Sequence, residues 1–303
     1  MKFDKRSVTT MRMFGRIAAI AAIALLAGCG AGAVPPETES GTDAPVPAES
    51  GAPAAPAAPA PSEPSDPSGG NADEPTEERA DESEPAPVPV DRDYYMDANF
   101  ILRPKDESGD KRVVLLTFDD GPKDEETLAA MLDALDRHEA KAIFFVNGYR
   151  AKRQPELLKS MRERGHHIGN HAWDHVDLKK QTPEEMERQI DDVQTLVREA
   201  TGEAPAFFRP PFGSGGEAVR AKAKEAGLLY MTWSNGSRDW EKGYDDPRKV
   251  IESVLEQLHP GSNILMHELP WTAEALDGLL NALKEKGYSV LDPARIDPDY
   301  SKS

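Results

Sequence analysis

The feature that most constrains this chain is a regular alternation, over its last two thirds, of short apolar runs with longer amphipathic segments. Seven apolar runs are predicted strands, at 113–117, 142–146, 167–170, 207–209, 228–232, 263–266 and 288–291. The predicted helices lie between them, at 124–138, 155–164, 183–200, 217–226, 247–258 and 272–286. Strands that alternate with helices in this way are typical of parallel βα units. We therefore expect an α/β fold, a deformed (β/α) barrel of about seven parallel strands, although the pattern alone also permits a doubly wound sheet.

The residues before this pattern have a different composition. Residues 30–90 contain no aromatic residue, 14 of the 26 prolines, 13 acidic side chains and a single base, Arg79. Their net charge is −12, out of −18 for the whole chain. Such a segment cannot bury enough apolar surface to offset the entropy of ordering it. We predict a disordered linker over 29–90, extended by its prolines and like charges, and one folded domain over 91–303.

The first residues are typical of a signal for export. A basic start precedes an apolar run at 17–26, which is shorter than the roughly 20 residues of a membrane-spanning helix. The run ends at Cys29, the only cysteine of the chain. The folded domain therefore has no thiol, so it cannot form an internal disulfide, and a bound metal would take nitrogen and oxygen ligands.

The tetrapeptide Leu26-Ala27-Gly28-Cys29 resembles the lipobox of bacterial lipoproteins. The resemblance implies that residues 1–28 are a signal peptide and that the sulfur of Cys29 carries diacylglycerol. The protein would then be lipid-anchored at the extracytoplasmic face of the cell membrane. The alternative is an ordinary secretory signal with an incidental cysteine.

The acidic charge balance bears on the partners of the folded domain. Binding to nucleic acid needs clustered lysine and arginine, and the sequence 91–303 shows no such cluster. We expect a monomer that does not bind nucleic acid.

Several polar residues follow predicted strands, where parallel barrels gather their functional groups. Asp119 and Asp120 end the first strand. Adjacent residues at a strand end project in different directions, so one carboxylate could bind a metal while the other acts as a base. The Asp-Asp-Gly-Pro sequence could also be only a turn.

Two histidines follow the third predicted strand. His171 and His175 are four residues apart, which places them on one face if the segment is helical. Two imidazoles and one carboxylate, with an open position for water, are a common catalytic zinc set.

The remaining candidates are unremarkable one by one. Arg209 precedes two prolines and the pair Phe212-Gly213, which reads as a rigid turn beside an arginine. Asp239-Trp240 follows the fifth strand, and His267 follows the sixth. A lone histidine after an apolar strand is more often a core residue than an acid.

Taken together and in this order, the segments resemble the five motifs of the NodB-type polysaccharide deacetylases, carbohydrate esterase family 4, over residues 113–291. The resemblance implies a NodB homology domain that hydrolyses amide bonds of N-acetyl groups on a glycan. It implies that Asp119 is the catalytic base, steadied by Arg209. It also implies that His267 is the catalytic acid, oriented by Asp239.

The same resemblance implies how metal and substrate are bound. The implied metal ligands are Asp120, His171 and His175, with Zn²⁺ the first expectation and Co²⁺ or Ni²⁺ alternatives. The implied substrate contacts are the backbone N–H of Phe212, for the oxyanion, and the side chains of Trp240 and Leu265, for the acetyl methyl group.

The expected substrate follows from the predicted lipid anchor at the cell surface, because the motifs do not determine it. A surface-anchored enzyme of this kind would remove N-acetyl groups from peptidoglycan N-acetylglucosamine or chitin-like oligomers and release acetate. The alternatives are an O-acetyl esterase acting on xylan and an inactive wall-binding lipoprotein.

Two positions depart from the family pattern. Ala172 stands where a serine or threonine usually follows the first histidine, so a hydrogen bond near the metal is expected to be missing. Gly236 stands where an additional aspartate usually lies, three residues before Asp239.

Overall fold

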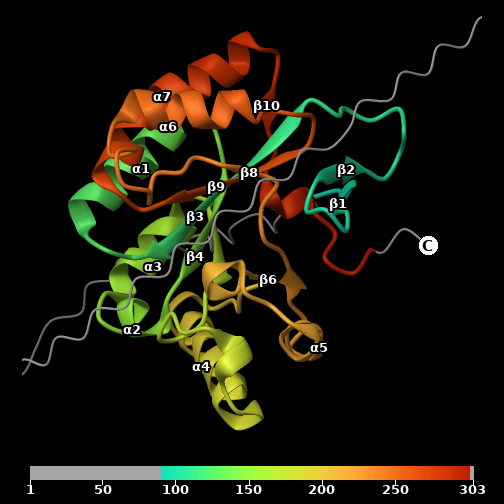
Figure 1. The fold of residues 1–303 in the computed structure, drawn as a ribbon, viewed down its shortest axis with the longest axis vertical. Helices are drawn as coiled ribbons and strands as arrows, with labels where there is room; N and C mark the ends of the chain where they lie inside the picture. Colours follow the sequence, from blue (N-terminus) through green and yellow to red (C-terminus); the bar gives the residue numbers. More distant parts are fainter. Residues whose placement is uncertain (1–89, 301–303) are drawn as a thin grey trace, which may run out of the picture. The chain divides into compact units, whose positions relative to one another are not determined.

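A parallel sheet built from the predicted apolar runs forms the centre of the structure (Figure 1). The structure is a computed structural model and describes residues 90–300, so the predicted signal peptide, Cys29 and nearly all of the linker lie outside the described residues. The strands run in the order β7 (Leu229–Tyr230), β6 (Phe207–Phe208), β5 (His167–Asn170), β4 (Ala142–Val146), β3 (Val113–Gly121), β9 (Ser262–His267) and β8 (Asn235–Gly236). A further strand, β10 (Ser289–Val290), also pairs with β3. The predicted parallel α/β half-barrel is confirmed, and β8 is a strand that the apolar runs did not indicate.

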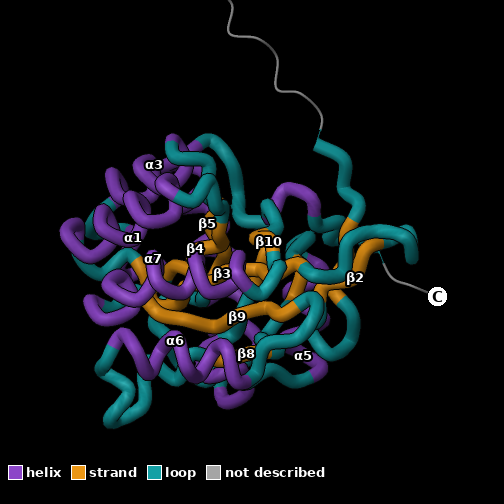
Figure 2. The backbone as a smooth tube through the Cα atoms, turned by 90° about the horizontal axis from the view of Figure 1, so that it is seen from above, coloured by secondary structure: helices purple, strands orange, loops and turns teal. Residues whose placement is uncertain are grey.

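The helices cover the outer face of this sheet (Figure 2). They are α1 (Glu125–Arg137), α2 (Gly148–Ala151), α3 (Pro155–Glu163), α4 (Pro183–Thr201), α5 (Glu217–Glu225), α6 (Pro247–Glu256) and α7 (Pro270–Glu285). All but the short α2 were predicted, each to within two residues at either end. The 3₁₀ turns are η1 (Leu178–Lys180), η2 (Pro211–Gly213) and η3 (Pro293–Arg295). No helix within residues 90–300 has the length and hydropathy that crossing a membrane requires.

Local sequence explains where the longest helix begins and ends. The side chain of Thr182 accepts a hydrogen bond from the backbone of Glu185, and the Glu185 carboxylate accepts one from the backbone of Thr182. This reciprocal capping satisfies N–H groups that the first turn of α4 leaves free. Gly202 ends the helix with φ 83°, a left-handed conformation that glycine adopts without a steric penalty.

Side chains of β3 alternate between two cores, as the pleat of a strand requires. Val114, Leu116 and Phe118 pack in the core under the helices, whereas Val113 and Leu115 pack in a second core inside the half-barrel. Thr117 and Asp119 continue this inner row at the carboxyl end of the strand. The same two-residue period that fills the core therefore directs Asp119 to the inside.

A hairpin that the sequence did not predict closes the amino-terminal end of the half-barrel. Its strands are β1 (Tyr94–Met96) and β2 (Leu102–Pro104), which pair antiparallel. Tyr94 is buried in the inner core and bridges Ile296 near the end of the described chain. The first and last described segments therefore meet at the pole opposite the carboxyl ends of the strands.

Candidate active site

A cavity of about 410 Å³ lies at the carboxyl ends of the strands. It is lined by Asp119, Asp120, His171, His175, Phe212, Gly213, Trp233, Trp240, Leu265 and His267. Eight of these were predicted site residues, and the structure brings them together from segments almost 150 positions apart. The other two predicted residues, Arg209 and Asp239, lie directly behind the cavity wall.

Asp120 leaves the regular strand at a bulge. Between Asp119 and Gly121 the register of β3 against β4 shifts, and Asp120 has φ 69°. A bulge re-aims one side chain without ending the sheet. The two adjacent carboxylates therefore have different main partners, Arg209 for Asp119 and the two histidines for Asp120.

Asp120 meets the two histidines on one side of the cavity. Its Oδ1 lies 3.5 Å from Nε2 of His171 and 3.2 Å from Nε2 of His175. The three ligand atoms lie within 4.8 Å of one another, a spacing that could hold one metal ion. Oδ1 of Asp120 is buried and accepts no hydrogen bond within residues 90–300. A buried polar atom without a partner is rare, and a cation would satisfy it. These nitrogen and oxygen donors fit the ligand set of a zinc site.

The backbone fixes the tautomer of His171. Its Nδ1 lies 2.7 Å from the carbonyl oxygen of Arg209. A carbonyl oxygen can only accept, so Nδ1 carries a proton, and in the neutral ring Nε2 then has a lone pair available to a metal. A metal ligand held this way is oriented before the ion binds.

The segment that carries the histidines is a loop rather than a helix turn. Ala172 and His175 have φ 61° and 55°, so the face-sharing expected of a helix does not explain their approach. The loop instead folds back, with the backbone N–H groups of Gly148 and Tyr149 donating to the carbonyls of Ala172 and Trp173.

Electrostatics favour the ligand forms of these side chains. Burial opposes ionisation of Asp120, but the nearby imidazoles, His171 first, outweigh burial and hold its pKa well below the usual range. Burial lowers the pKa of His175 despite the nearby carboxylates. An ionised carboxylate and neutral imidazoles are the forms that bind a metal.

Asp119 forms an ion pair with a fully buried arginine. Its Oδ1 accepts a hydrogen bond of 2.6 Å from Arg209, which is 0% exposed. Its Oδ2 lies 3.7 Å from Nε2 of His171, on the metal side of the cavity. One oxygen of Asp119 is thus held while the other borders the cavity.

Arg209 is itself held by its remaining donors. Its guanidinium donates to Thr117 Oγ1, the Thr232 carbonyl and Asn263 Oδ1, and it stacks over the ring of Phe145 at 4.4 Å. A buried guanidinium needs such partners because its charge has lost its hydration. Arg209 is therefore a buried residue behind the cavity wall rather than part of an exposed turn.

His267, at the end of β9, pairs with a second buried carboxylate. Its Nδ1 lies 2.8 Å from Oδ1 of Asp239, which is 1% exposed. Oδ2 of Asp239 accepts further hydrogen bonds from the backbone N–H of His267 and from Thr272, each 2.7 Å long. Burial opposes protonation of His267, but the hydrogen bond and charge of Asp239 outweigh it and raise the pKa above the ordinary value.

The rest of the cavity wall is apolar. Leu265 is 3% exposed, and Trp233 and Trp240 meet edge to face at 6.5 Å. Trp240 also packs against His267, with ring centroids 5.2 Å apart. Phe212 stands at the rim, 65% exposed and with φ 62°. Trp233, which directly follows the predicted strand at 228–232, was not among the predicted site residues.

Neither departure from the family pattern removes a contact that the neighbouring site residues need. Ala172 is fully buried in an apolar cluster, and the orientation of His171 depends on Arg209 rather than on residue 172. At Gly236 a Cβ atom would lie 3.5 Å from Trp240, an ordinary contact. Asp239 has its full set of partners with glycine at 236.

Sequence reasoning missed one buried carboxylate beside the cavity. Glu268, which directly follows His267, is 1% exposed, and its Oε1 accepts hydrogen bonds from the backbone of Lys123 at 2.5 Å and of Asp124 at 3.3 Å. Burial raises the pKa of Glu268, against the effect of these donors. An acidic residue next to a predicted catalytic histidine was the only available signal.

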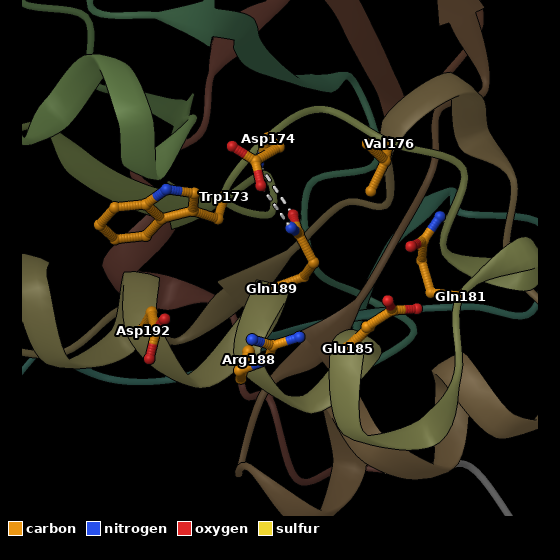
Figure 3. A pocket seen from close by; sticks show the side chains of 8 residues that line it. All are labelled: Trp173, Asp174, Val176, Gln181, Glu185, Arg188, Gln189 and Asp192. Carbon is orange, nitrogen blue, oxygen red and sulfur yellow. Dashed lines mark hydrogen bonds between the residues drawn. The ribbon is translucent and has the colours of Figure 1, made fainter.

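A second hollow, of about 360 Å³, adjoins the histidine loop (Figure 3). It is lined by Trp173, Asp174, Val176, Gln181, Glu185, Arg188, Gln189 and Asp192. Figure 3 shows Gln189 of α4 facing Asp174, with which it exchanges two hydrogen bonds of 2.7 and 2.8 Å. The loop thus separates this groove from the cavity, because His175 of the same loop lines the cavity.

Comparison with known proteins gives a consistent result. Residues 106–231 match the family model described as polysaccharide deacetylase. The chain is 41% identical over 179 residues to the peptidoglycan-N-acetylglucosamine deacetylase PgdA of Listeria monocytogenes, covering 59% of this chain and 37% of PgdA. It is 35% identical over 182 residues to the peptidoglycan-N-acetylmuramic acid deacetylase PdaA of Bacillus subtilis, covering 59% of this chain and 69% of PdaA.

Solved structures agree with this result. BA3943 of Bacillus anthracis, described as a pseudoenzyme of carbohydrate esterase family 4, superposes with a TM-score of 0.57 at 30% identity, covering 59% of this chain and 63% of that one. The chain thus spans little more than a third of PgdA but more than two thirds of PdaA. With the fold and the cavity described above, these similarities show that the chain belongs to the polysaccharide deacetylase family, the NodB-type family 4 of carbohydrate esterases.

Proposed function

We propose that this protein is a metal-dependent hydrolase that removes N-acetyl groups from cell-wall glycan and releases acetate. One observation carries the proposal: Asp120, His171 and His175 converge on a cavity that two buried carboxylate–cation pairs also border. That combination supplies a metal position, a base and an acid around a single reacting bond.

We propose that Asp120, His171 and His175 hold a divalent ion, Zn²⁺ first and Co²⁺ or Ni²⁺ as alternatives. When bound, such an ion polarises the amide carbonyl and lowers the pKa of water. The protein residues do the rest. Asp119, steadied by Arg209, accepts the proton of the attacking water through its free oxygen. His267, kept protonated by Asp239, donates a proton to the departing amine nitrogen.

The cavity wall suits the acetyl group. Leu265, Trp233 and Trp240 present apolar surface beside His267, where the methyl group would lie. In the mechanism proposed here, the backbone N–H of Phe212 donates to the developing oxyanion.

The surroundings of the cavity support a polymer as substrate. The groove beside the histidine loop offers an indole, planar amide and carboxylate groups and the exposed guanidinium of Arg188, the side-chain types that hydrogen-bond to sugar hydroxyls. The relatives named as peptidoglycan deacetylases favour peptidoglycan over chitin-like oligomers, and PgdA, at 41% identity against 35% for PdaA, is named for N-acetylglucosamine.

We also propose a monomeric lipoprotein, anchored through Cys29 at the extracytoplasmic face of the membrane, with residues 30–90 as a spacer. Its support is the lipobox-like tetrapeptide and the composition of the spacer. Cys29→Ser should release the protein from the membrane fraction. An equally membrane-bound variant would contradict the anchor.

The test of the activity is acetate release by the purified protein from peptidoglycan, chitin oligomers and acetylated xylan, before and after chelation. We expect metal-dependent release from peptidoglycan. Release from xylan alone would make the protein an O-acetyl esterase, and no release from any glycan by metal-loaded protein would make it a wall-binding pseudoenzyme.

A further inference from the structure

The segment after Asp120 is anchored unequally on its two sides. Toward β4 it has backbone support, because the carbonyl of Gly121 accepts a hydrogen bond of 3.0 Å from Asn147. Toward β9 the ladder ends with the pairing of Asp119 and His267, and the backbone N–H of Glu268 reaches only the carbonyl of Asp119, at 3.3 Å. Beyond that point, the Glu268 side chain makes the connection.

Glu268 spans the gap between the two strand ends. It accepts hydrogen bonds from Lys123 and Asp124, just before α1, although its own backbone continues β9. Its other oxygen, Oε2, is buried, has no hydrogen-bond partner within residues 90–300, and lies where a Cβ atom on Gly121 would come within 2.5 Å. The carboxylate thus fills the space beside Gly121 and accepts hydrogen bonds from the backbone N–H groups of Lys123 and Asp124.

We propose that Glu268 is a positioning residue that sets the place of the metal ligand Asp120 relative to the acid His267. Glu268 directly follows His267, and the turn that it holds, residues 121–124, directly follows Asp120. The side chain therefore links the segment after Asp120 to the segment after His267 through the hydrogen bonds from Lys123 and Asp124. This role needs a hydrogen-bond acceptor at the Oε1 position of residue 268. The Glu268 side chain itself does not line the cavity. The inference rests on the proposed function for the metal site as well as for the catalytic readout.

The test compares Glu268→Ala with Glu268→Gln, and uses Glu274→Ala as the matched control. Glu274 is an exposed glutamate of α7, six residues further on. Affinity is measured by titrating metal-free protein with Co²⁺ and following its visible absorption, and kcat is measured at saturating metal. We expect Glu268→Ala to weaken Co²⁺ binding about tenfold, alter the spectrum and lower kcat. Glu268→Gln should restore all three, because its amide oxygen can still accept from Lys123.

Two outcomes would overturn the inference. In one, Glu268→Ala loses thermal stability but keeps the wild-type Co²⁺ affinity, spectrum and kcat, which is a purely structural role. In the other, Glu268→Gln is as impaired as Glu268→Ala. Because the Co²⁺ titration needs no turnover, a wild-type protein that releases no acetate would contradict the proposed function while still testing Glu268.

A double-mutant cycle gives a second test. Gly121→Ala places a methyl group against Oε2 of Glu268, so by itself it should weaken Co²⁺ binding. In the Glu268→Ala background the space is open, and the added methyl group should do little further harm. We expect the two effects on Co²⁺ affinity to be strongly non-additive. Additive effects would show that the two residues act separately and would contradict the inference.

Discussion

Each side of the cavity has a pair of one acidic and one basic side chain, but the buried member is the base on one side and the acid on the other. On one side, Arg209 is buried and Asp119 borders the cavity; on the other, Asp239 is buried and His267 borders it. The exposed fractions of the side chains are 0% and 4% for the first pair, and 0% and 14% for the second. In each pair the fully buried member has the larger set of partners. In each pair, the member that borders the cavity is therefore the one that we propose transfers a proton.

The largest effects should come from the two cavity-facing members. Asp119→Asn and His267→Ala should each lower kcat by about 10²–10⁴-fold, because each removes one proton-transfer group. Acetate release at saturating metal measures both. Bound Co²⁺ and a cooperative unfolding transition serve as controls for an intact fold. Near-normal turnover in either variant would contradict the proton-transfer role proposed for that residue.

Arg209→Met tests the buried member on the base side. It leaves the Asp119 charge without its partner, and breaking a buried pair in this way costs about 3–5 kcal/mol of unfolding free energy. Urea denaturation measures the loss, and exposed Arg198→Met on α4 is the control. A loss below about 1 kcal/mol would mean that solvent, rather than Arg209, compensates Asp119.

Asp239→Asn tests the buried member on the acid side, where we expect a smaller effect. The Asp239 carboxylate raises the pKa of His267, so its removal lowers that pKa. The acid works only when protonated, and activity is lost as the pH rises through its pKa. The alkaline limb of the pH profile of kcat should therefore move to lower pH. An unmoved limb would show that another group sets it.

Thr272→Val should have the smallest effect. It removes the 2.7 Å hydrogen bond that Thr272 donates to Oδ2 of Asp239, while the backbone N–H of His267 still donates to the same oxygen. We expect a loss of about 1.5 kcal/mol in unfolding free energy and a few-fold lower kcat. A larger loss of kcat in Thr272→Val than in Asp239→Asn would reverse the order of effects proposed for the acid side.

Much of the fold was predictable because its local signals agree with one another. The apolar runs gave seven of the parallel strands, and Thr182, Glu185 and Gly202 marked the ends of α4. The β1–β2 hairpin was not predictable. Its strands have three residues each, and its stability comes from Tyr94 and Leu102 packing against strands far along the chain.

The site was predictable in membership but not in geometry. The motifs named eight cavity residues, and period-two alternation along β3 could have placed Asp119 on the inside. The approach of His171 to His175 depends on positive φ angles in a loop, and that of Asp120 on a bulge. Such features arise from the sum of tertiary contacts, so neither spacing nor propensity reveals them. Glu268 was missed for the same reason, since its two donors lie more than 140 positions away.

The pairing of Tyr94 with Ile296 has a practical consequence. Because residues 90 and 300 both lie near the hairpin pole, the two ends of the described domain lie on the side away from the mouth of the cavity. A bead, a fluorophore or a fusion partner coupled at either end would therefore leave the mouth facing the solution. Immobilised protein should accept insoluble wall fragments as readily as free protein does.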